Sequence, residues 1–459
     1  MKIKYIGMKK LIIALVALLL VGAAAYWYFH RDNDKAREVV PEDATAVAVL
    51  EPAELIQSLG LKEDKVKKLT MNFEDILEAI DLAKPVYAFS TEKGLTGIAM
   101  NVKDAEKLLK AISVYGFASE EQNGLQWIVN NSTIGCLDED KVLLCDASTP
   151  SAQDALMDVM SKLMSQGKKE VEALEKVDEQ EGVFRLSAPL KGIPEEYTKN
   201  LPAGISDAIL NAGLQIGKKD ISLSAHLTTD FSSLPLAPIE GTLAGIGPED
   251  PFVSVQFNLR GEQLLPLLRQ VPQIRSLLLA LNMNVDVDMM LKAVNGDVSF
   301  VIPKFDLKHP DFLVTASLAN TDFLKNADDW DQVHKLGAND YVFEYEGNRA
   351  YFGVRDKNLY ITTNVSLANN TRDNAKLHVF NSSTKGKYLS ASLNIGQVLD
   401  AYPGLAMLLR TMPQVRDIAD AFESVSLVAD TPQNLELSIQ TRKPVKDIIS
   451  NVMTLVTGE

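Results

Sequence analysis

Histidines are the first residues to consider for chemistry, because imidazole serves near neutral pH both as a general base and as a metal ligand. None of them stands in an HExxH motif or beside a cysteine at metal-binding spacing. The sequence also lacks a GxSxG nucleophile elbow, a phosphate-binding loop and a dinucleotide-binding fingerprint. We therefore predict no catalytic, cofactor-binding or metal-binding residues, and a protein that is not an enzyme. The histidines are His30, His226, His309, His334 and His378.

The only two cysteines, Cys136 and Cys145, lie on either side of an acidic turn in the run IGCLDEDKVLLCD. A hairpin centred on this turn places Cys136 opposite Leu143 and leaves Cys145 diagonal to it. That spacing is long for a disulfide, whereas an oxidising compartment favours one. A disulfide between the two cysteines and a pair of buried thiols therefore remain alternatives.

The residues from 264 to 294 are rich in leucine and methionine, and they include the phrase LLRQVPQIR, which returns at 408–416 as LLRTMPQVR. Apolar residues at helical spacing on both sides of the proline predict one helix that ends before it and a second that starts at it. The extra apolar surface would suit a lipid or a protein partner, and the alternative is additional core in the second copy or docking on the first copy. The candidate residues of this apolar partner surface are Leu264, Leu268, Val271, Leu277 and Leu281.

The charge of the 459-residue chain argues against nucleic-acid binding. The formal net charge is -15, and the first 31 residues contain five basic and no acidic residues. The remainder therefore has 46 − 5 = 41 basic residues against 61 acidic ones, a net charge of -20. Such a surface repels polyanions, which excludes a nucleic-acid partner.

The segment from Leu11 to Phe29 is apolar and uncharged, which predicts a transmembrane signal anchor within residues 1–31. The preceding lysines predict a cytoplasmic N-terminus and an extracytoplasmic bulk, so residues 11–29 would partner the lipid bilayer of a single-pass membrane protein. The aromatic residues at 26–29 favour a retained anchor. Cleavage near Ala25, which would release a secreted protein, is the alternative.

Short motifs recur in the same order along the chain, which indicates an internal duplication. Pro-Glu-Asp stands at 41–43 and at 248–250, and Ser-Ala-x-Leu stands at 187–190 and at 390–393. We infer two copies of a module of about 200 residues, a usual domain size. The predicted parts are a linker at 32–39, a first repeat domain at 40–245 and a second at 246–459.

Each copy shows alternating apolar strands followed by amphipathic helices, without strict strand–helix–strand alternation. The predicted fold class is α+β, with an N-terminal transmembrane helix followed by two tandem homologous domains of antiparallel sheet with helices packed on one face.

The start of the first copy, VPEDATAVAVLEPAELIQSLGL, resembles the start of the exported part of a family of uncharacterised bacterial envelope proteins, a domain of unknown function. The resemblance implies no activity and no catalytic residues. Many of these proteins are lipid-anchored, and this chain departs from them because it has no cysteine near the N-terminus. The matching residues are Val40, Pro41, Asp43, Ala44, Val47, Val49, Leu55, Ser58, Gly60 and Leu61.

A duplication without a reactive constellation predicts a non-catalytic binding or scaffolding protein of the cell envelope, with an envelope protein as partner. One alternative is a carrier of an apolar ligand or lipid that uses residues 264–294. Another is a hydrolase with a non-standard site, which requires a cleft where an acid or base has a strongly shifted pKa.

Overall fold

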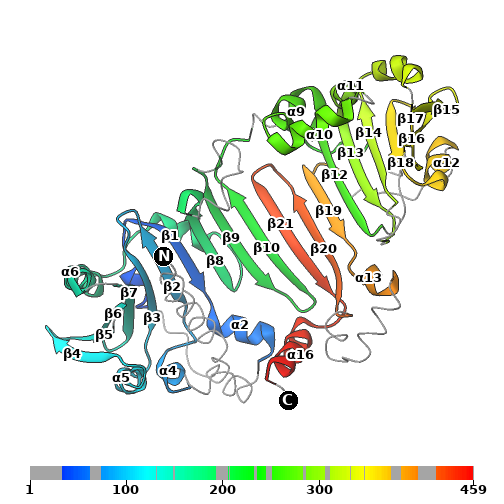
Figure 1. Cartoon of the computed structure of the whole chain (residues 1–459). Coiled ribbons are helices and arrows are strands. Elements are labelled where there is room, and N and C mark those ends of the chain that lie inside the picture. Colours follow the sequence, from blue (N-terminus) through cyan, green and yellow to red (C-terminus); the bar gives the residue numbers. More distant parts are fainter. Residues whose placement is uncertain are drawn as a thin grey trace. The chain divides into compact units, whose positions relative to one another are not determined.

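The structure is a computed structural model of the whole chain (Figure 1). Its polypeptide separates into two compact units. Unit 1 comprises Met1–Thr229 together with Lys443–Glu459, and unit 2 comprises Asp230–Arg442. The residues that the structure describes are 34–61, 74–130, 132–147, 150–192, 205, 207–231, 235–243, 251–282, 286–304, 306, 311–330, 332–345, 347–373, 384–401 and 420–457.

The described residues of unit 1 form ten antiparallel strands in the order β4-β5-β6-β7-β3-β2-β1-β8-β9-β10. The hairpins form where short polar turns separate apolar runs, as at Asp138–Asp140 between two buried strands. The strands are β1 (Ala44–Leu50), β2 (Val86–Thr91), β3 (Thr96–Asn101), β4 (Ala118–Gln122), β5 (Leu125–Val129), β6 (Thr133–Leu137), β7 (Lys141–Asp146), β8 (Phe184–Pro189), β9 (Ile209–Ile216) and β10 (Asp220–Leu227).

Helices cover both faces of the unit 1 strands, because successive residues of a strand point to opposite faces. Val49 of β1 shares a buried cluster with residues of α6 (Pro150–Ser165) and α7 (Glu172–Asp178). Its neighbour Leu50 belongs to a second cluster. That cluster includes residues of α2 (Pro52–Leu59), α4 (Glu74–Ala79), α5 (Ala105–Ser113) and α16 (Val445–Thr457).

Unit 2 repeats the pairing order of unit 1, with strands ordered β15-β16-β17-β18-β14-β13-β12-β19-β20-β21. A two-strand ribbon also joins β11 (Leu236–Ala237) to one end of β12. The other strands are β12 (Val253–Arg260), β13 (Val294–Ile302), β14 (Leu313–Leu318), β15 (Val333–Lys335), β16 (Asp340–Tyr345), β17 (Asn348–Arg355), β18 (Asn358–Thr362), β19 (Leu389–Leu393), β20 (Phe422–Ala429) and β21 (Asn434–Thr441).

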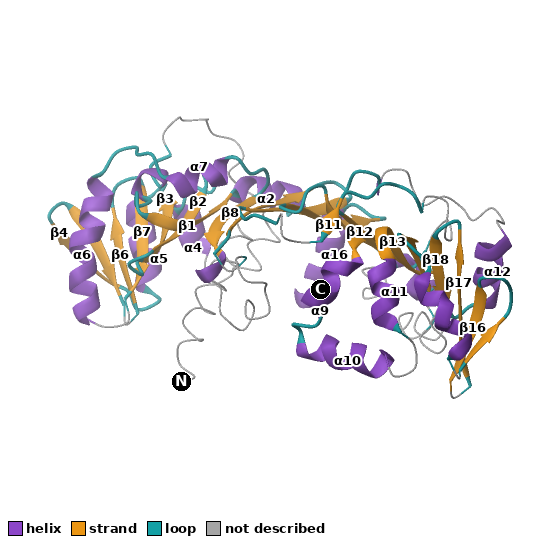
Figure 2. Ribbon diagram, turned by 90° about the horizontal axis from the view of Figure 1, so that it is seen from above, coloured by secondary structure: helices purple, strands orange, loops and turns teal. Residues whose placement is uncertain are grey.

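The helices of unit 2 also lie on two faces. Leu264 of α9 (Gly261–Leu268), Met289 of α11 (Val287–Ala293) and Phe323 of the 3-10 helix η4 (Asp322–Asp329) pack in one cluster. Ala368 of α12 (Val365–Asp373) packs with Val301 in another. Figure 2 shows α10 (Pro272–Asn282) on the same side as α9 and α11 and farthest from the strands. The predicted helix start at Pro272 is confirmed.

The predicted fold class is wrong. Among the residues that the structure describes, antiparallel sheet dominates with 21 strands, and the helices lie on both faces of the strands rather than on one. The prediction failed because it treated each strand as half-buried. Neighbouring residues such as Val49 and Leu50 are both buried, so both faces require cover.

The predicted single-pass membrane localisation is likewise wrong. Across the residues that the structure describes, no helix combines the length and the apolar character needed to cross a bilayer. The segment that carried the prediction, 11–29, lies outside those residues, as does the second copy of the repeated phrase at 408–416.

The close contact between α9 and α11 depends on Gly261, where a Cβ atom would overlap the carbonyl oxygen of Leu291. We expect Gly261→Ala to lower the free energy of unfolding by about 2–3 kcal/mol, because α9 must shift away from α11. Urea denaturation followed by circular dichroism measures this change. The control is Gly167→Ala, whose new Cβ meets nothing within 4 Å. Equal midpoints for the two variants would contradict the packing.

Candidate functional site

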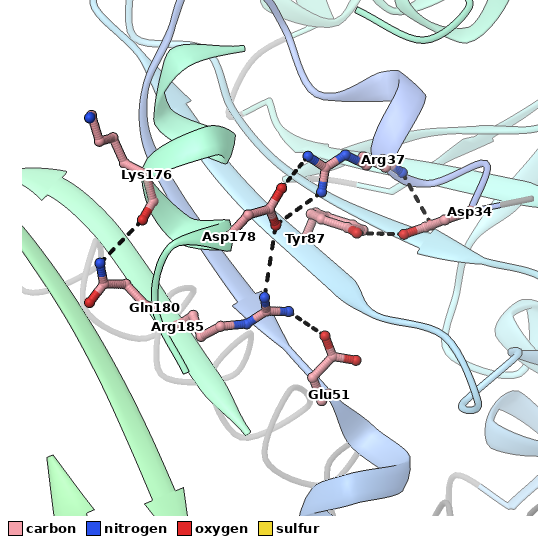
Figure 3. A network of polar contacts seen from close by, with 8 residues as sticks. All are labelled: Asp34, Arg37, Glu51, Tyr87, Lys176, Asp178, Gln180 and Arg185. Atoms are coloured by element: carbon pink, nitrogen blue, oxygen red, sulfur yellow. Dashed lines mark hydrogen bonds and ion pairs between the residues drawn. The ribbon is translucent and has the colours of Figure 1, made fainter. Parts of the chain in front are cut away.

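Charged side chains gather around Asp178, at the C-terminal end of α7 in unit 1 (Figure 3). The helix buries Leu174 and Val177 against the β1–β8 region, which fixes its last residue beside the sheet. Arg37 reaches Asp178 from the 3-10 helix η2 (Arg37–Val39), and Arg185 reaches it from β8. Three segments that are distant in sequence therefore meet at one carboxylate.

Asp178 binds both arginines, and the second arginine continues to another acid. Arg37 donates through both of its terminal nitrogens, with Nη1 3.1 Å from Oδ1 of Asp178. Arg185 Nη1 lies 3.8 Å from the same oxygen, and Arg185 Nη2 donates to Glu51 at the start of α2. Each arginine thus has a carboxylate partner, which largely offsets the cost of removing these charges from water.

Asp34 closes the other end of this network. It accepts hydrogen bonds from the hydroxyl of Tyr87 and from Nδ2 of Asn101, the latter at 2.8 Å. The side chain of Asn101 in turn accepts the backbone N–H of Ala36 at 3.2 Å. Residues 34–40, which include part of the predicted linker, are therefore tied to the sheet, and Val39 is fully buried.

The pKa directions show what this network can do chemically. Burial is the main cause that raises the pKa of Tyr87, and the charge of Asp34 raises it further. The hydrogen bond to Asp178 raises the pKa of Arg37, while burial raises the pKa of Glu51 against the opposing effect of Arg185. Tyr87 is thus a hydrogen-bond donor and Arg37 a permanent cation. The arrangement resembles a structural clamp more than an acid–base pair.

In unit 2 the buried carboxylate of Asp297 also holds parts of the fold together. Asp297 is 3% exposed. It accepts the backbone N–H groups of Glu240 and Thr242, the hydroxyl of Thr242, and Nδ2 of Asn258. The four donors lie 2.7–3.0 Å away. Asp297 therefore fastens the 240–242 segment to the sheet.

The two cysteines are free thiols, and both are buried. Cys136 pairs in register with Leu143, as the hairpin prediction expected, and Cys145 pairs with Ile134. Burial is the first cause that raises the pKa of each thiol to about 12. Both belong to the core cluster under α6, where they act as small apolar residues.

The predicted apolar partner surface is divided between core and solvent. Leu264 packs against the α11 cluster, and Leu268 is half-buried. Val271 and Leu277 are exposed, by 43% and 59%. The side chain of Leu281 lies outside the described residues.

Two further exposed leucines belong to this surface, Leu267 at 36% and Leu279 at 61%. Helical periodicity missed them because it places them off the apolar stripe. For Leu279 the signal was the run LLLAL at 277–281, which has more apolar residues than one face of α10 can bury. That helix packs on α11 and buries Leu278. We call Leu267, Val271, Leu277 and Leu279 the leucine surface.

An apolar sheet face of unit 2 is also only partly covered. Phe257 and Val298 point to the face that α9 and α11 cover. The registers place Leu389, Leu427 and Leu437 on that same face along β19, β20 and β21. These three leucines retain partial exposure.

Comparison with known proteins gives a family match without an activity. A family model described as Domain of unknown function (DUF4836) matches residues 228–449. This part of the chain therefore carries a domain of unknown function. The predicted membership in an uncharacterised family is confirmed to that extent. No curated protein matches the sequence.

Solved structures of TP0453 are weakly similar. Crystal form I is 14% identical, with 44% of this chain and 81% of that chain covered and a TM-score of 0.31. Crystal form III is 13% identical, with 43% and 80% covered and a TM-score of 0.32. Scores this low do not establish a shared fold.

Asp178 joins Arg37 to Arg185 in the clamp, so replacing its carboxylate by a neutral group should destabilise the fold. We expect Asp178→Asn to lower the free energy of unfolding by about 1–2 kcal/mol, because Arg37 loses its carboxylate while partly buried. Asp43→Asn removes the exposed ion pair with Lys93 and should change it by less than about 0.5 kcal/mol. Chemical denaturation at low salt measures both, and equal effects would refute the clamp.

The raised thiol pKa values predict slow labelling of the native protein. At pH 8 a thiol with a pKa of about 12 is roughly one ten-thousandth thiolate, the form that reacts. A colorimetric thiol reagent should therefore label neither cysteine in the native chain and both after denaturation without reductant. Fast native labelling would contradict the burial, and no labelling after denaturation would reveal a disulfide.

Proposed function

We propose that this chain is a non-catalytic binding protein that takes up a long-chain amphiphile through the leucine surface of unit 2. The observation that carries the proposal is the exposure of four large apolar side chains on the consecutive helices α9 and α10 and in the turn between them. Isolated exposed leucines are ordinary in folded proteins. A group of them on adjoining helices is typical of a binding surface.

Apolar contact with this surface would contribute to the free energy of binding. Full burial of a leucine side chain contributes about 1.5–3 kcal/mol. Leu277 and Leu279 each keep roughly three fifths of their surface in water, so each has about 1–2 kcal/mol still to gain. Because they are two positions apart on a helix, the two leucines lie on opposite flanks of its buried stripe. A hydrocarbon chain along one flank would therefore gain about 1–2 kcal/mol, before the cost of association.

The charges of this surface favour an anionic head on the amphiphile. Between Gln263 and Val285 the charged residues are Arg269 and Arg275, in a chain whose net charge is -15. Arg269 is paired with Asp288. Arg275 is exposed on α10 one helical turn before Leu279, so Arg275 can contact the head of an amphiphile while Leu279 contacts its chain. A long-chain carboxylate meets both requirements.

The same geometry gives less support to catalysis. Within the described residues, the charged groups around Asp178 contact one another in the clamp, and Asp297 is occupied by four donors. A hydrolase would need an acid or base with a shifted pKa facing a cleft. Tyr87 and Glu51, whose pKa values are raised, are instead engaged in contacts that hold segments of the fold.

The test is the double variant Leu277→Ser with Leu279→Ser, measured by titration of the full chain with a fluorescent long-chain fatty acid. We expect its affinity to fall at least tenfold, because about 1.4 kcal/mol of lost apolar contact corresponds to that factor. Leu336→Ser is the matched control, since Leu336 is 51% exposed in the same unit and lies outside the leucine surface. It should leave the affinity unchanged.

Three outcomes would overturn the proposal: no binding by the unaltered chain, equal loss in the control, or no loss in the double variant. Arg275→Gln tests the head group separately. This variant should weaken binding of the fatty acid and leave binding of the matching long-chain alcohol unchanged.

A further inference from the structure

The strand β4 presents an open edge of the unit 1 sheet. It pairs with β5, and no other described strand pairs with it. In Figure 1 it is the outermost strand of this unit. All five of its residues are exposed. Every second N–H and C=O group along an edge strand points away from its neighbour, so β4 offers hydrogen-bonding groups to an added strand.

The turn that joins β4 to β5 holds the edge in an extended conformation before any partner arrives. Asn123 and Gly124 have φ values of 55° and 78°, which correspond to the two central positions of a type I′ turn. Trp127 of β5 lies opposite Glu120, is 5% exposed and belongs to the buried cluster of unit 1. Its burial holds β5 in place. A preformed edge lowers the entropic cost of adding a strand.

The side chains of β4 select against a second copy of this chain. Glu120 and Glu121 occupy the centre of the strand and point to opposite faces. Two copies of β4 could pair antiparallel with Glu120 of one copy opposite Glu121 of the other. On both faces of the sheet a glutamate would then lie directly opposite a glutamate. Like charges directly opposite destabilise a strand pair. The same charges favour a strand with basic side chains.

An apolar contact adjoins the charged edge. Val114 and Tyr115, in the turn between α5 and β4, are 83% and 39% exposed. Val114 is the most exposed of the large apolar side chains that the structure describes. An added strand that extends past Ala118 would bury both residues. The edge thus combines main-chain hydrogen bonding, negative charge and an apolar anchor.

We propose that the β4 edge is a docking site for an extended peptide segment rich in lysine or arginine, which adds to the sheet as an eleventh strand of unit 1. The main chain of such a segment pairs with β4, its basic side chains face Glu120 and Glu121, and an apolar residue covers Val114. This site lies in the other unit from the leucine surface and is independent of the amphiphile proposal.

The probe is a synthetic nine-residue peptide that alternates pairs of lysines with pairs of threonines and ends in valine, so that its lysines reach both faces of the strand. The control peptide has glutamate in place of each lysine. Hydrogen exchange of the full chain should show slower exchange of amides in residues 118–122 with the basic peptide and no change with the acidic one. The variant Glu120→Gln with Glu121→Gln should weaken the basic peptide at least tenfold at low salt. Val114→Ser should weaken it by a smaller factor.

The matched control is Glu139→Gln with Asp140→Asn, which neutralises two exposed acids in another hairpin turn of unit 1. It should leave the affinity within twofold. Equal binding of the two peptides, an equal loss in the control variant, or unchanged exchange at 118–122 would overturn the proposal. Self-association of the chain alone that protects these amides would assign the edge to a second copy instead.

Discussion

Burial of both faces of an antiparallel sheet is the constraint on which the rest of this structure depends. Each strand points successive side chains in opposite directions, so a wide sheet with apolar residues on both faces needs cover on both. In unit 1 the cover comes from α6 and α7 on one face and from α2, α4, α5 and α16 on the other. The clamp around Asp178 belongs to the same requirement. It fastens η2 over β2 and β3, so that Val39 and Val40 can enter the core.

The parts of the fold that follow from neighbouring residues could be predicted. The turn between β6 and β7 sets Cys136 opposite Leu143, because the hairpin register depends on a few residues. The proline at 272 starts α10, because its ring fixes the backbone and removes an N–H that a first helical turn does not use. Helix periodicity also indicated where leucines are in excess, although it did not single out Leu267 and Leu279.

Long-range pairing could not be read in this way. Nothing in the types of Arg37, Asp178 and Arg185 shows that a short 3-10 helix, the end of α7 and β8 meet, since 141 residues separate the first two. The two-sided cover was missed for a related reason. A strand with adjacent buried residues has the same composition as a piece of buried helix, and only its partners distinguish the two. The recurring pairing order of the two units arises from contacts of this long-range kind.

Binding surfaces in such a fold arise where the cover ends. Residues of α10 pack on α11 rather than on the strands, so this helix buries one stripe and leaves leucines on its flanks. At β4 the sheet itself ends, and glutamates prevent the edge from pairing with its own kind. The two proposals assign different ligands to these surfaces, one through apolar contact beside Arg275 and the other through an acidic edge. Both proposals depend on local departures from the average surface of an acidic chain, because the net charge alone repels anions and does not distinguish among cations.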